Sequence, residues 1–289
     1  FPLINLLKKN KPDFLIIHLV TSLPLILFNI FNFKTKLILR ISGLPKLDFL
    51  RKKLWKFSSK SIFKITSPTK ETLNHLERSK IFNSDKLINL PDPIIDINEF
   101  RKKINDDRFK PEIELNFDYF LSVGRFSKQK NFIYLINEFE KFLLKSKNFK
   151  LLIIGGGEDE SQLKKLVKNK GLEDDIFLLG RTENVFYYMK RAKAFVLSSL
   201  WEDPGFVLIE SALSNLFVIS SDCPNGPREI LDYGKSGILY KSNSKNELAF
   251  SLEKYLSLDD LKKQKVKTKK NAMKYTQFRH FLKLDKFLK

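Results

Sequence analysis

The chain is poor in cysteine and histidine, with one Cys and three His among 289 residues. A single thiol, Cys223, cannot form an internal disulfide, which agrees with a reducing compartment such as the cytoplasm. The sequence also lacks a Cys and His cluster with metal-ligand spacing, so we expect no metal site. The acidic residues 158–160 are typical of a solvated first helical turn, where the helix dipole favours carboxylates.

Long apolar runs are also missing. The longest stretch, 14–33, is interrupted by polar residues and by Pro24, whereas a membrane-spanning helix needs about 20 mainly apolar residues. A strand followed by a helix explains this stretch better. The opening residues lack the charged and apolar regions of a signal peptide, and the chain begins at Phe1 without a methionine, so it reads as a fragment.

Basic residues, by contrast, are abundant. The formal net charge is +20, and residues 1–110 carry 22 Lys and Arg against 10 Asp and Glu. Such a charge favours anionic partners, which include nucleotide sugars, anionic lipid head groups and nucleic acid. Charge alone does not choose among these partners, and the codon bias of an AT-rich genome explains part of the lysine excess equally well.

Strand and helix patterns alternate through the first part of the chain. The expected elements are a strand at 14–18, a helix at 23–31, a strand at 36–43, a helix at 46–60, a strand at 62–65 and a helix capped by Thr69. Such alternation is typical of a parallel, doubly wound sheet. With hydrophobic residues at 43%, the chain can build cores for two domains.

The second part repeats this alternation with glycine turns after its strands. The segment LSVGRFSKQKN, residues 121–131, predicts a strand that ends at Gly124 and Arg125, with Lys130 at the start of a helix. A strand, a tight turn and cations at a helix start suit a diphosphate. The segment LLIIGGGEDESQLKKL, residues 151–166, is the next such unit, so this part is predicted to be Rossmann-like.

The segment WEDPGFVLIE, residues 201–210, places two glutamates eight positions apart around a Pro-Gly turn. Gly205 allows a ligand to approach the backbone, and the amides that open the following helix attract a phosphate. Glu202 lies in the loop, where a carboxylate accepts hydrogen bonds from sugar hydroxyls, and Glu210 lies about two turns into the helix. Two such glutamates alone are equally typical of a solvated surface. The neighbouring segments therefore have to decide between a ligand site and a solvated surface.

Taken in this order, the segments GRFSKQKN, GGGE, LLGR, WEDPGFVLIE and SSDCPNGPREIL resemble the donor-binding domain of family 4 retaining glycosyltransferases, also called glycosyl transferases group 1. The resemblance covers roughly residues 119–240. It implies an α/β protein with the GT-B fold, in which two Rossmann-like domains face a cleft, the first being incomplete here. Within that family, the CPNGPREI-like segment is frequent in bacterial enzymes that build lipid-linked or cell-surface glycans.

The resemblance also implies a domain order. We expect an N-terminal acceptor-side domain at 1–107, truncated at its start, because nothing before Pro12 resembles the first strand and glycine-rich loop of such a domain. A nucleotide-sugar donor-binding domain should occupy 108–275, and a helix at 276–289 should pack back on the first domain. The segment 90–118, rich in prolines and charges, is expected to be the interdomain linker.

The resemblance places a donor site at the ends of these strands. Arg125 and Lys130 are expected to neutralise the donor diphosphate, and Glu210 to bind ribose hydroxyls. Gly180 and Arg181 end a strand where the family's base-binding loop lies, although a simple turn fits them almost as well. The donor-binding residues expected in all are Gly124, Arg125, Lys130, Gly180, Arg181, Gly205, Phe206, Val207 and Glu210.

The expected catalytic residues lie where the sequence departs from the family pattern. Glu202 is expected to contact the donor sugar near the reacting carbon, but many members have Glu-Gly-Phe-Gly in this loop, so a role for Asp203 stays open. His18 ends the first expected strand, at the sheet edge where ligands bind, and is either a catalytic residue or a packed core residue. After the next strand many relatives place another histidine, whereas this chain has Arg40 and Ser42.

The basic segment 46–60 has two interpretations. A basic amphipathic helix can lie on an anionic membrane surface, or its apolar face can pack on the sheet. Both would hold at once if Trp55 faces outward.

The resemblance therefore implies a retaining, metal-independent glycosyltransferase of the hexosyltransferase type. It would move a sugar from a nucleotide diphosphate donor, a UDP-sugar by family frequency, to a glycan or lipid-linked acceptor in bacterial surface polysaccharide synthesis. The nucleotide sugar is a substrate, so no cofactor is implied, and we expect a cytoplasmic protein that is peripheral at the inner face of the cell membrane. Two alternatives stay open: a GT-B relative such as a nucleotide-sugar epimerase, and a basic nucleic-acid-binding protein. No nucleic acid partner is expected, because no binding module is recognised.

Overall fold

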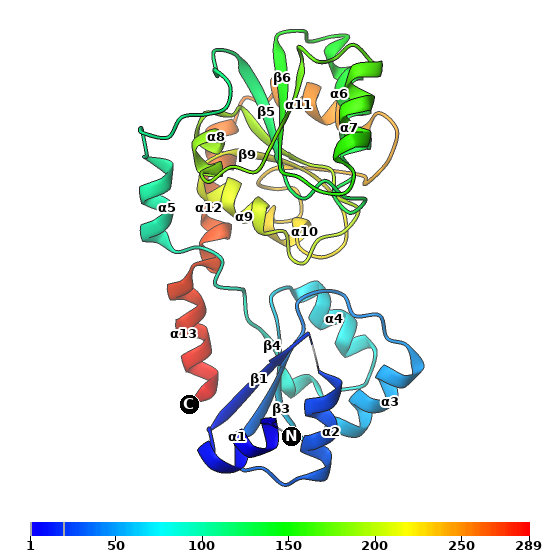
Figure 1. The fold of residues 1–289 in the computed structure, drawn as a ribbon, viewed down its shortest axis with the longest axis vertical. Helices are drawn as coiled ribbons and strands as arrows, with labels where there is room; N and C mark the ends of the chain where they lie inside the picture. The colour runs from blue at the N-terminus through cyan, green and yellow to red at the C-terminus, as the bar shows by residue number, and fades with distance from the viewer. Residues whose placement is uncertain (1, 20) are drawn as a thin grey trace. The chain divides into compact units, whose positions relative to one another are not determined.

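The computed structural model describes residues 2–19 and 21–289. The chain divides into two compact units, Phe1–Pro91 and Asp92–Lys289, and each has its own parallel sheet covered by helices (Figure 1). The alternation of strands and helices in the sequence is therefore realised twice.

The first unit, as far as it is described, contains a four-stranded parallel sheet in the order β1-β2-β3-β4. His18 and Arg40 are paired in the register of β1 and β2, at the carboxyl ends of these strands. The elements of this unit are α1 (Pro2–Asn10), β1 (Phe14–His18), α2 (Ser22–Ile30), β2 (Lys36–Arg40), α3 (Phe49–Ser58), β3 (Ile62–Ser67), α4 (Lys70–Arg78), the 3-10 helix η1 (Ser84–Lys86) and β4 (Leu87–Asn89).

Local chemistry sets the helix starts in this unit. Thr69 caps α4 as predicted, because its Oγ1 accepts a hydrogen bond from the Thr72 amide at 3.2 Å. Helix α3 begins at Phe49 and not at residue 46, because Asp48 is its cap and accepts from the Arg51 amide at 2.8 Å.

Trp55 of α3 packs in the apolar cluster of the first unit. Trp55 is 4% exposed, and its ring centroid lies 5.6 Å from that of Phe82. The sequence analysis expected membrane contact and packing to hold at once only if Trp55 faced outward. Trp55 faces inward, so this condition is not met.

The second unit has a six-stranded parallel sheet in the order β10-β9-β8-β5-β6-β7. Its elements are α5 (Ile97–Ile104), β5 (Asp118–Val123), α6 (Phe132–Leu143), β6 (Phe149–Ile154), α7 (Glu160–Asn169), β7 (Ile176–Leu179), α8 (Val185–Arg191), β8 (Ala194–Leu197), α9 (Phe206–Leu213), β9 (Phe217–Ser221), α10 (Pro227–Ile230), β10 (Ile238–Tyr240), α11 (Glu247–Leu256), α12 (Leu261–Ala272), the 3-10 helix η2 (Met273–Tyr275) and α13 (Gln277–Leu288).

Successive strands are added to this sheet first on one side of β5 and then on the other. The strands β5, β6 and β7 succeed one another toward one edge, and β8, β9 and β10 toward the other. In open α/β sheets, ligands bind outside the carboxyl ends of the strands at such a switch point. The loops after β5 and β8 are therefore the first place to look for a site.

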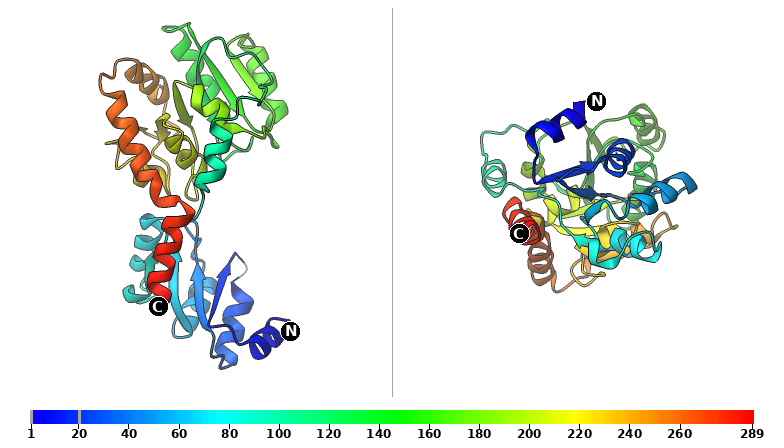
Figure 2. Two further views of the ribbon diagram at one scale, coloured as in Figure 1. Left: turned by 90° about the vertical axis from the view of Figure 1, so that its left-hand side faces the viewer. Right: turned by 90° about the horizontal axis from the view of Figure 1, so that it is seen from below.

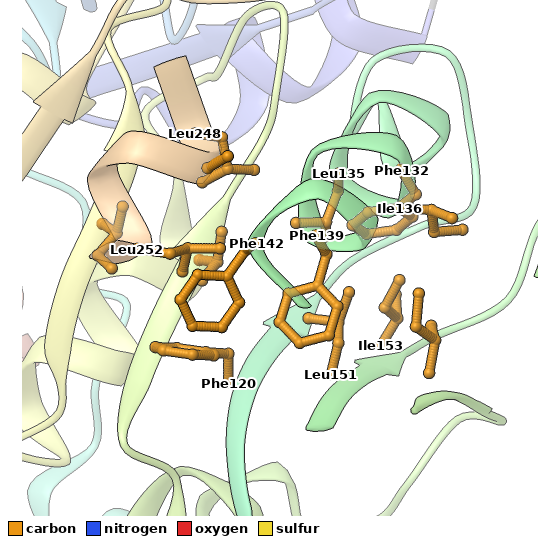
Figure 3. Packing of buried hydrophobic residues seen from close by; sticks show 14 of the residues in the cluster. Phe120, Phe132, Leu135, Ile136, Phe139, Phe142, Leu151, Ile153, Leu248 and Leu252 are labelled. Atoms are coloured by element: carbon orange, nitrogen blue, oxygen red, sulfur yellow. The ribbon is translucent and has the colours of Figure 1, made fainter. Parts of the chain in front are cut away.

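Two apolar clusters cover the two faces of this sheet. Figure 3 shows part of the first cluster, in which α6 and α11 pack against β5 and β6. The ring centroids of Phe139 and Phe142 in α6 lie 6.3 and 5.6 Å from that of Phe120 in β5. On the opposite face α8, α9 and α12 pack against alternate residues of β5, including Tyr119 and Leu121. The resulting three layers hold the strand ends in place.

The segment 90–118 contains a helix where the sequence indicated a linker. Asp96 caps α5, and Phe100 meets Phe186 of α8 edge to face with ring centroids 5.0 Å apart. The sequence analysis did not predict α5, because the segment is rich in prolines and charges and has few apolar residues to pack. Residues 92–107, expected in the first domain, thus pack here with the second unit.

The helix expected at 276–289 forms as α13, capped by Thr276, and follows α12 in the orange to red part of the chain in Figure 2. Its expected packing on the first domain stays a prediction. None of the helices in the described residues is both long and apolar enough to cross a bilayer.

We expect Phe139→Ala to lower the free energy of unfolding of the second unit by about 3–5 kcal/mol, because the ring is fully buried. Urea unfolding followed by circular dichroism would measure this loss. Phe250→Ala removes the same ring from a position that is 56% exposed. That control should lose less than about 1 kcal/mol. Equal losses in the two variants would contradict the packing of α6 on β5.

Candidate active site

A cavity of about 340 Å³ opens at the carboxyl ends of β5, β6 and β7. The structure brings together here three residues that the sequence analysis assigned to the donor site, Gly124, Arg125 and Arg181. Gly180 precedes Arg181 at the end of β7 but does not itself line the cavity. The lining residues are Val123, Gly124, Arg125, Ile154, Gly155, Gly156, Arg181, Thr182 and Val185.

The glycine turn after β6 lets two loops approach closely beside this cavity. Gly155 has φ +153°, and a Cβ placed there would lie 1.9 Å from the Gly124 carbonyl oxygen. A Cβ on Gly157 would lie 2.4 Å from the carbonyl oxygen of Phe126. Side chains at these positions would push the loops apart, so the turn requires glycine.

Arg125 lies at the mouth of the cavity in a surface ion pair. Its Nε donates to Glu158 Oε2 at 3.0 Å, with side-chain exposures of 72% and 54%. The pKa of Glu158 is lowered, first by a hydrogen bond from its own backbone amide and further by Arg125. Exposed pairs contribute little to stability. The Arg125 guanidinium can therefore exchange Glu158 for another anion at small cost.

Lys130 and Glu202 meet in a buried ion pair at the switch point. The Lys130 Nζ lies 2.6 Å from Glu202 Oε1, and the Ser199 hydroxyl donates to the same oxygen at 2.5 Å. The Lys130 and Glu202 side chains are only 15% and 5% exposed. The sequence placed Lys130 on a diphosphate and Glu202 on a sugar. The structure adds that the two residues also bind each other.

The loop after β8 is held on the loop after β5 by further hydrogen bonds. The Leu200 amide donates to the Gln129 carbonyl at 2.8 Å, and the Gln129 side chain donates to the Trp201 carbonyl at 2.9 Å. The Ser198 hydroxyl donates to the Lys130 carbonyl at 2.7 Å. Sequence reasoning missed Gln129, Ser198 and Ser199, although two serines at the end of an apolar strand were a visible signal.

The start of α9 is built as predicted around Gly205, which has φ +93°. The Leu208 amide already bonds to the Gly205 carbonyl at 3.1 Å, so the amides of Phe206 and Val207 lie ahead of the helix's own hydrogen bonds. A Cβ on Gly226 would lie 1.9 Å from the Pro204 carbonyl oxygen, so the loop after β9 also needs a glycine to pack against this turn. The helix N-terminus is thereby presented at the carboxyl edge.

Glu210 lies in α9, half-buried, on the same unit. Burial raises the pKa of this carboxyl to about 7, and the nearby positive charge of Lys103 on α5 opposes the shift. A carboxyl with such a pKa carries a proton in part of the molecules at neutral pH. It can then donate as well as accept hydrogen bonds.

His18 lies in the first unit at the end of β1, and it is exposed, not packed in the core. Its Nε2 is 3.0 Å from Arg40 Nη1 and 3.0 Å from the Ser42 hydroxyl. A guanidinium only donates, so Nε2 is the acceptor in the contact with Arg40. The alternative of a core histidine is thus wrong, and a catalytic role stays a prediction.

A metal-binding cluster was not expected from the sequence. Within the described part of the chain, His, Cys, Asp and Glu side chains do not gather in groups of three that could hold an ion.

Glycine turns, arginines and a helix N-terminus at the carboxyl edge of a doubly wound sheet are typical of nucleotide-binding α/β proteins. Residues 103–275 match the family described as "Glycosyl transferases group 1". The chain therefore belongs to this family.

Similar sequences include glycosyltransferases. The chain is 31% identical over 278 residues to an uncharacterised glycosyltransferase of Methanocaldococcus jannaschii, covering 85% of this chain and 67% of the relative. It is 28% identical over 284 residues to a Campylobacter jejuni GalNAc-alpha-(1->4)-GalNAc-alpha-(1->3)-diNAcBac-PP-undecaprenol alpha-1,4-N-acetyl-D-galactosaminyltransferase, covering 97% and 75%. It is also 31% identical over 194 residues to another transferase of that organism, of which it spans 51%.

Solved structures share the fold. A glycosyltransferase from Rickettsia africae has a TM-score of 0.81 at 16% identity, covering 99% of this chain and 79% of that one. HepE of Anabaena, in complex with UDP, has a TM-score of 0.79 at 15% identity, covering 99% and 82%. These likenesses confirm the predicted α/β class with two Rossmann-like domains, the GT-B fold.

Folding should be linked to protonation of Glu210, whose pKa rises from 4.5 to about 7. The folded state holds this proton more tightly, so the stabilisation is present below pH 4.5 and is lost as the pH rises through 7. We expect Glu210→Gln to gain stability relative to the natural chain between pH 5 and pH 8, by on the order of 2–3 kcal/mol. Urea unfolding at both pH values would measure it. Glu173→Gln, at an exposed site, is the control, and a pH-independent difference for Glu210→Gln would contradict the shift.

Breaking the buried pair at one end should be costly. Lys130→Met leaves the Glu202 carboxylate buried without its partner, so we expect a loss of about 3–5 kcal/mol in unfolding free energy. The double variant Lys130→Met with Glu202→Gln should recover at least about 1 kcal/mol, because no buried charge remains. Lys128→Met, at an exposed neighbouring position, is the control. Additive losses in the double variant would show that the two residues do not interact.

Proposed function

We propose that this chain is a retaining glycosyltransferase that moves a sugar from a UDP-sugar to a hydroxyl of a glycan or lipid-linked acceptor. The observation that carries the proposal is the convergence on one sheet edge of Arg125, Arg181 and the glycine turns, with the start of α9 on the same edge. Backbone amides and guanidinium groups at such an edge are suited to a diphosphate.

The cavity after β5, β6 and β7 is proposed to take the nucleoside. Its walls combine apolar residues, such as Ile154 and Val185, with glycine backbone that a flat base can approach. Glu210 is proposed to bind the ribose hydroxyls. The choice of UDP is supported by the solved relatives HepE and TarM, which were determined in complex with UDP.

The proposed reaction breaks the bond between the anomeric carbon and the donor phosphate oxygen. The acceptor oxygen forms the new bond on the same face, and its proton passes to an oxygen of the leaving diphosphate. Arg125, Lys130 and the α9 amides would stabilise the negative charge that develops on the leaving group. These groups supply positive potential without a metal, so the proposed chemistry is metal-independent.

Glu202 has a double role in this proposal. Its carboxylate holds Lys130 at the switch point, and its remaining oxygen is available to accept from a donor sugar hydroxyl. A lysine already held by one anion loses less conformational freedom when it meets a second. His18 stays a candidate catalytic group of the first unit.

The acceptor class is proposed from the relatives. The two Campylobacter jejuni transferases are named for undecaprenol-linked diphosphate substrates, and a Staphylococcus aureus relative is named a poly(ribitol-phosphate) alpha-N-acetylglucosaminyltransferase. We therefore place the chain in bacterial glycan or surface polysaccharide synthesis. A cytoplasmic protein that is peripheral at the inner membrane face would meet such acceptors.

Calorimetric titration with UDP, GDP and ADP tests the donor site. We expect UDP to bind most tightly, and Arg125→Ala to weaken it at least tenfold, about 1.4 kcal/mol, through loss of a charge-assisted contact. Lys128→Ala, at an exposed lysine three residues away, should change the affinity less than twofold. The site would be refuted if none of the three nucleotides binds, or if Arg125→Ala and Lys128→Ala change the affinity equally.

Product analysis then tests the reaction type. Incubation with a UDP-sugar and an acceptor should give a product whose anomeric configuration, read by NMR, matches the donor. Addition of EDTA should leave the rate unchanged. An inverted product or loss of activity with EDTA would refute those two parts of the proposal separately.

A further inference from the structure

The turn that precedes α9 carries a second carboxylate, whose role the sequence left open. Asp203 follows Glu202 in the loop after β8 and is exposed, whereas Glu202 is buried. The Glu202 carboxylate is held through its Oε1 by Lys130 and Ser199. Two carboxylates therefore stand next to each other along the chain, one fixed in the interior and one at the surface.

Asp203 is held in place by the loop after β9. Asn225, which is 1% exposed, donates from its Nδ2 to Asp203 Oδ1 at 3.2 Å. The Glu202 amide donates to the Pro224 carbonyl at 2.9 Å, so two hydrogen bonds join the same two loops. Among the described residues, Asn225 alone hydrogen-bonds to the Asp203 carboxyl. The second oxygen, Oδ2, is therefore available to a ligand.

Negative charge exceeds positive charge at this turn. The pKa of Asp203 is raised, first by desolvation and further by the charge of Glu202, whereas the hydrogen bond from the β9 loop and the charge of Lys130 oppose the shift. One lysine thus acts on two carboxylates. In the next loop Asp222 and Arg228 pair with each other, with Oδ1 and Nε 2.8 Å apart, so their charges cancel. The turn carries a net negative charge when Asp203 is ionised.

The exposed side chains of this turn suit a sugar. Trp201 and Phe206, which flank it along the chain, are 43% and 46% exposed. A pyranose ring offers apolar C–H faces to aromatic side chains and hydroxyl donors to carboxylates. The cations Arg125 and Arg181 lie in the wall of the cavity after β5, β6 and β7. The charges of the unit are thus divided between a positive part suited to phosphate and a negative part suited to hydroxyl groups.

We propose that Asp203 is a specificity-determining residue of the donor site. Its Oδ2 accepts a hydrogen bond from a hydroxyl of an uncharged donor sugar, and its charge excludes donor sugars that carry a carboxylate. A uronic acid would bring a third carboxylate to a turn that already holds two and only one lysine, and like charges disfavour such a complex. The inference rests on the proposed function, because it names the class of sugar that the donor carries.

Calorimetric titration of the full chain at pH 8 with paired donors tests this inference. We expect UDP-glucose to bind at least fivefold more tightly than UDP-glucuronate, and UDP-galactose at least fivefold more tightly than UDP-galacturonate. The members of each pair differ only at C6, which carries a hydroxyl group in one and is a carboxylate in the other. Like-charge repulsion predicts this difference.

Asp203→Asn is the test variant, because it keeps the shape of the side chain and an acceptor for Asn225 but removes the charge. In this variant the ratio within each pair should fall below twofold, since Lys130 then balances Glu202. UDP-glucose should bind at least threefold more weakly than to the natural chain, because an amide nitrogen in place of Oδ2 accepts no hydrogen bond.

Two controls separate this effect from damage to the site. UDP without a sugar should bind to Asp203→Asn at least as tightly as to the natural chain, which also shows that the loop is intact. Asp174→Asn removes the same charge from an exposed position between α7 and β7, and it should change each ratio less than twofold.

Three results would overturn the inference. Equal binding of neutral and acidic donors by the natural chain would show that charged sugars are not excluded. Unchanged ratios in Asp203→Asn would assign the discrimination to other residues, and an unchanged affinity for UDP-glucose would remove the hydroxyl contact. A natural chain that binds UDP but fails these tests refutes this inference alone. If UDP itself does not bind, the proposed donor site fails.

Discussion

The buried contact of the Glu202 carboxylate with Lys130 and Ser199 ties together the loops that follow β5 and β8, the two neighbouring strands at which the sheet reverses its order. Such a pair is not a strong source of net stability, because desolvation offsets much of the attraction. Its effect is geometric. With the two loops joined, the glycine turns, Arg125 and the start of α9 are all presented on one edge.

The two units place positively charged groups at their sheet edges by different means. In the second unit, glycine backbone, arginines near a cavity and a helix N-terminus lie on one edge, a combination suited to a nucleotide. In the first unit, the side chains of Arg40, Lys46 and Arg51 line a cavity at the carboxyl ends of β1 and β2. Part of the chain's large positive charge is therefore concentrated in cavity walls and is not spread evenly over the surface.

Patterns in the sequence located most of the first unit, including β1 at its full extent and the Thr69 cap, because alternation and capping act over a few residues. Helix α5 was missed, because its apolar residues are few and gain their meaning only from α8. At the candidate site the resemblance assigned Gly124, Arg125 and Arg181 to the donor site, and the structure places all three in the wall of one cavity. It did not indicate that Glu158 pairs with Arg125, or that Glu202 pairs with Lys130, since both contacts join distant segments.

The alternation of strands and helices along the chain, the glycine turns and the family were therefore contained in the linear sequence, because each depends on short-range periodicity or on a local motif. Burial was not. Whether Trp55 faces inward, whether Glu210 keeps its proton near neutral pH, and which cations share a wall all depend on elements that come together only on folding. Desolvation and charge pairing are set by neighbours in space, so the electrostatic character of both cavities is a property of the tertiary structure.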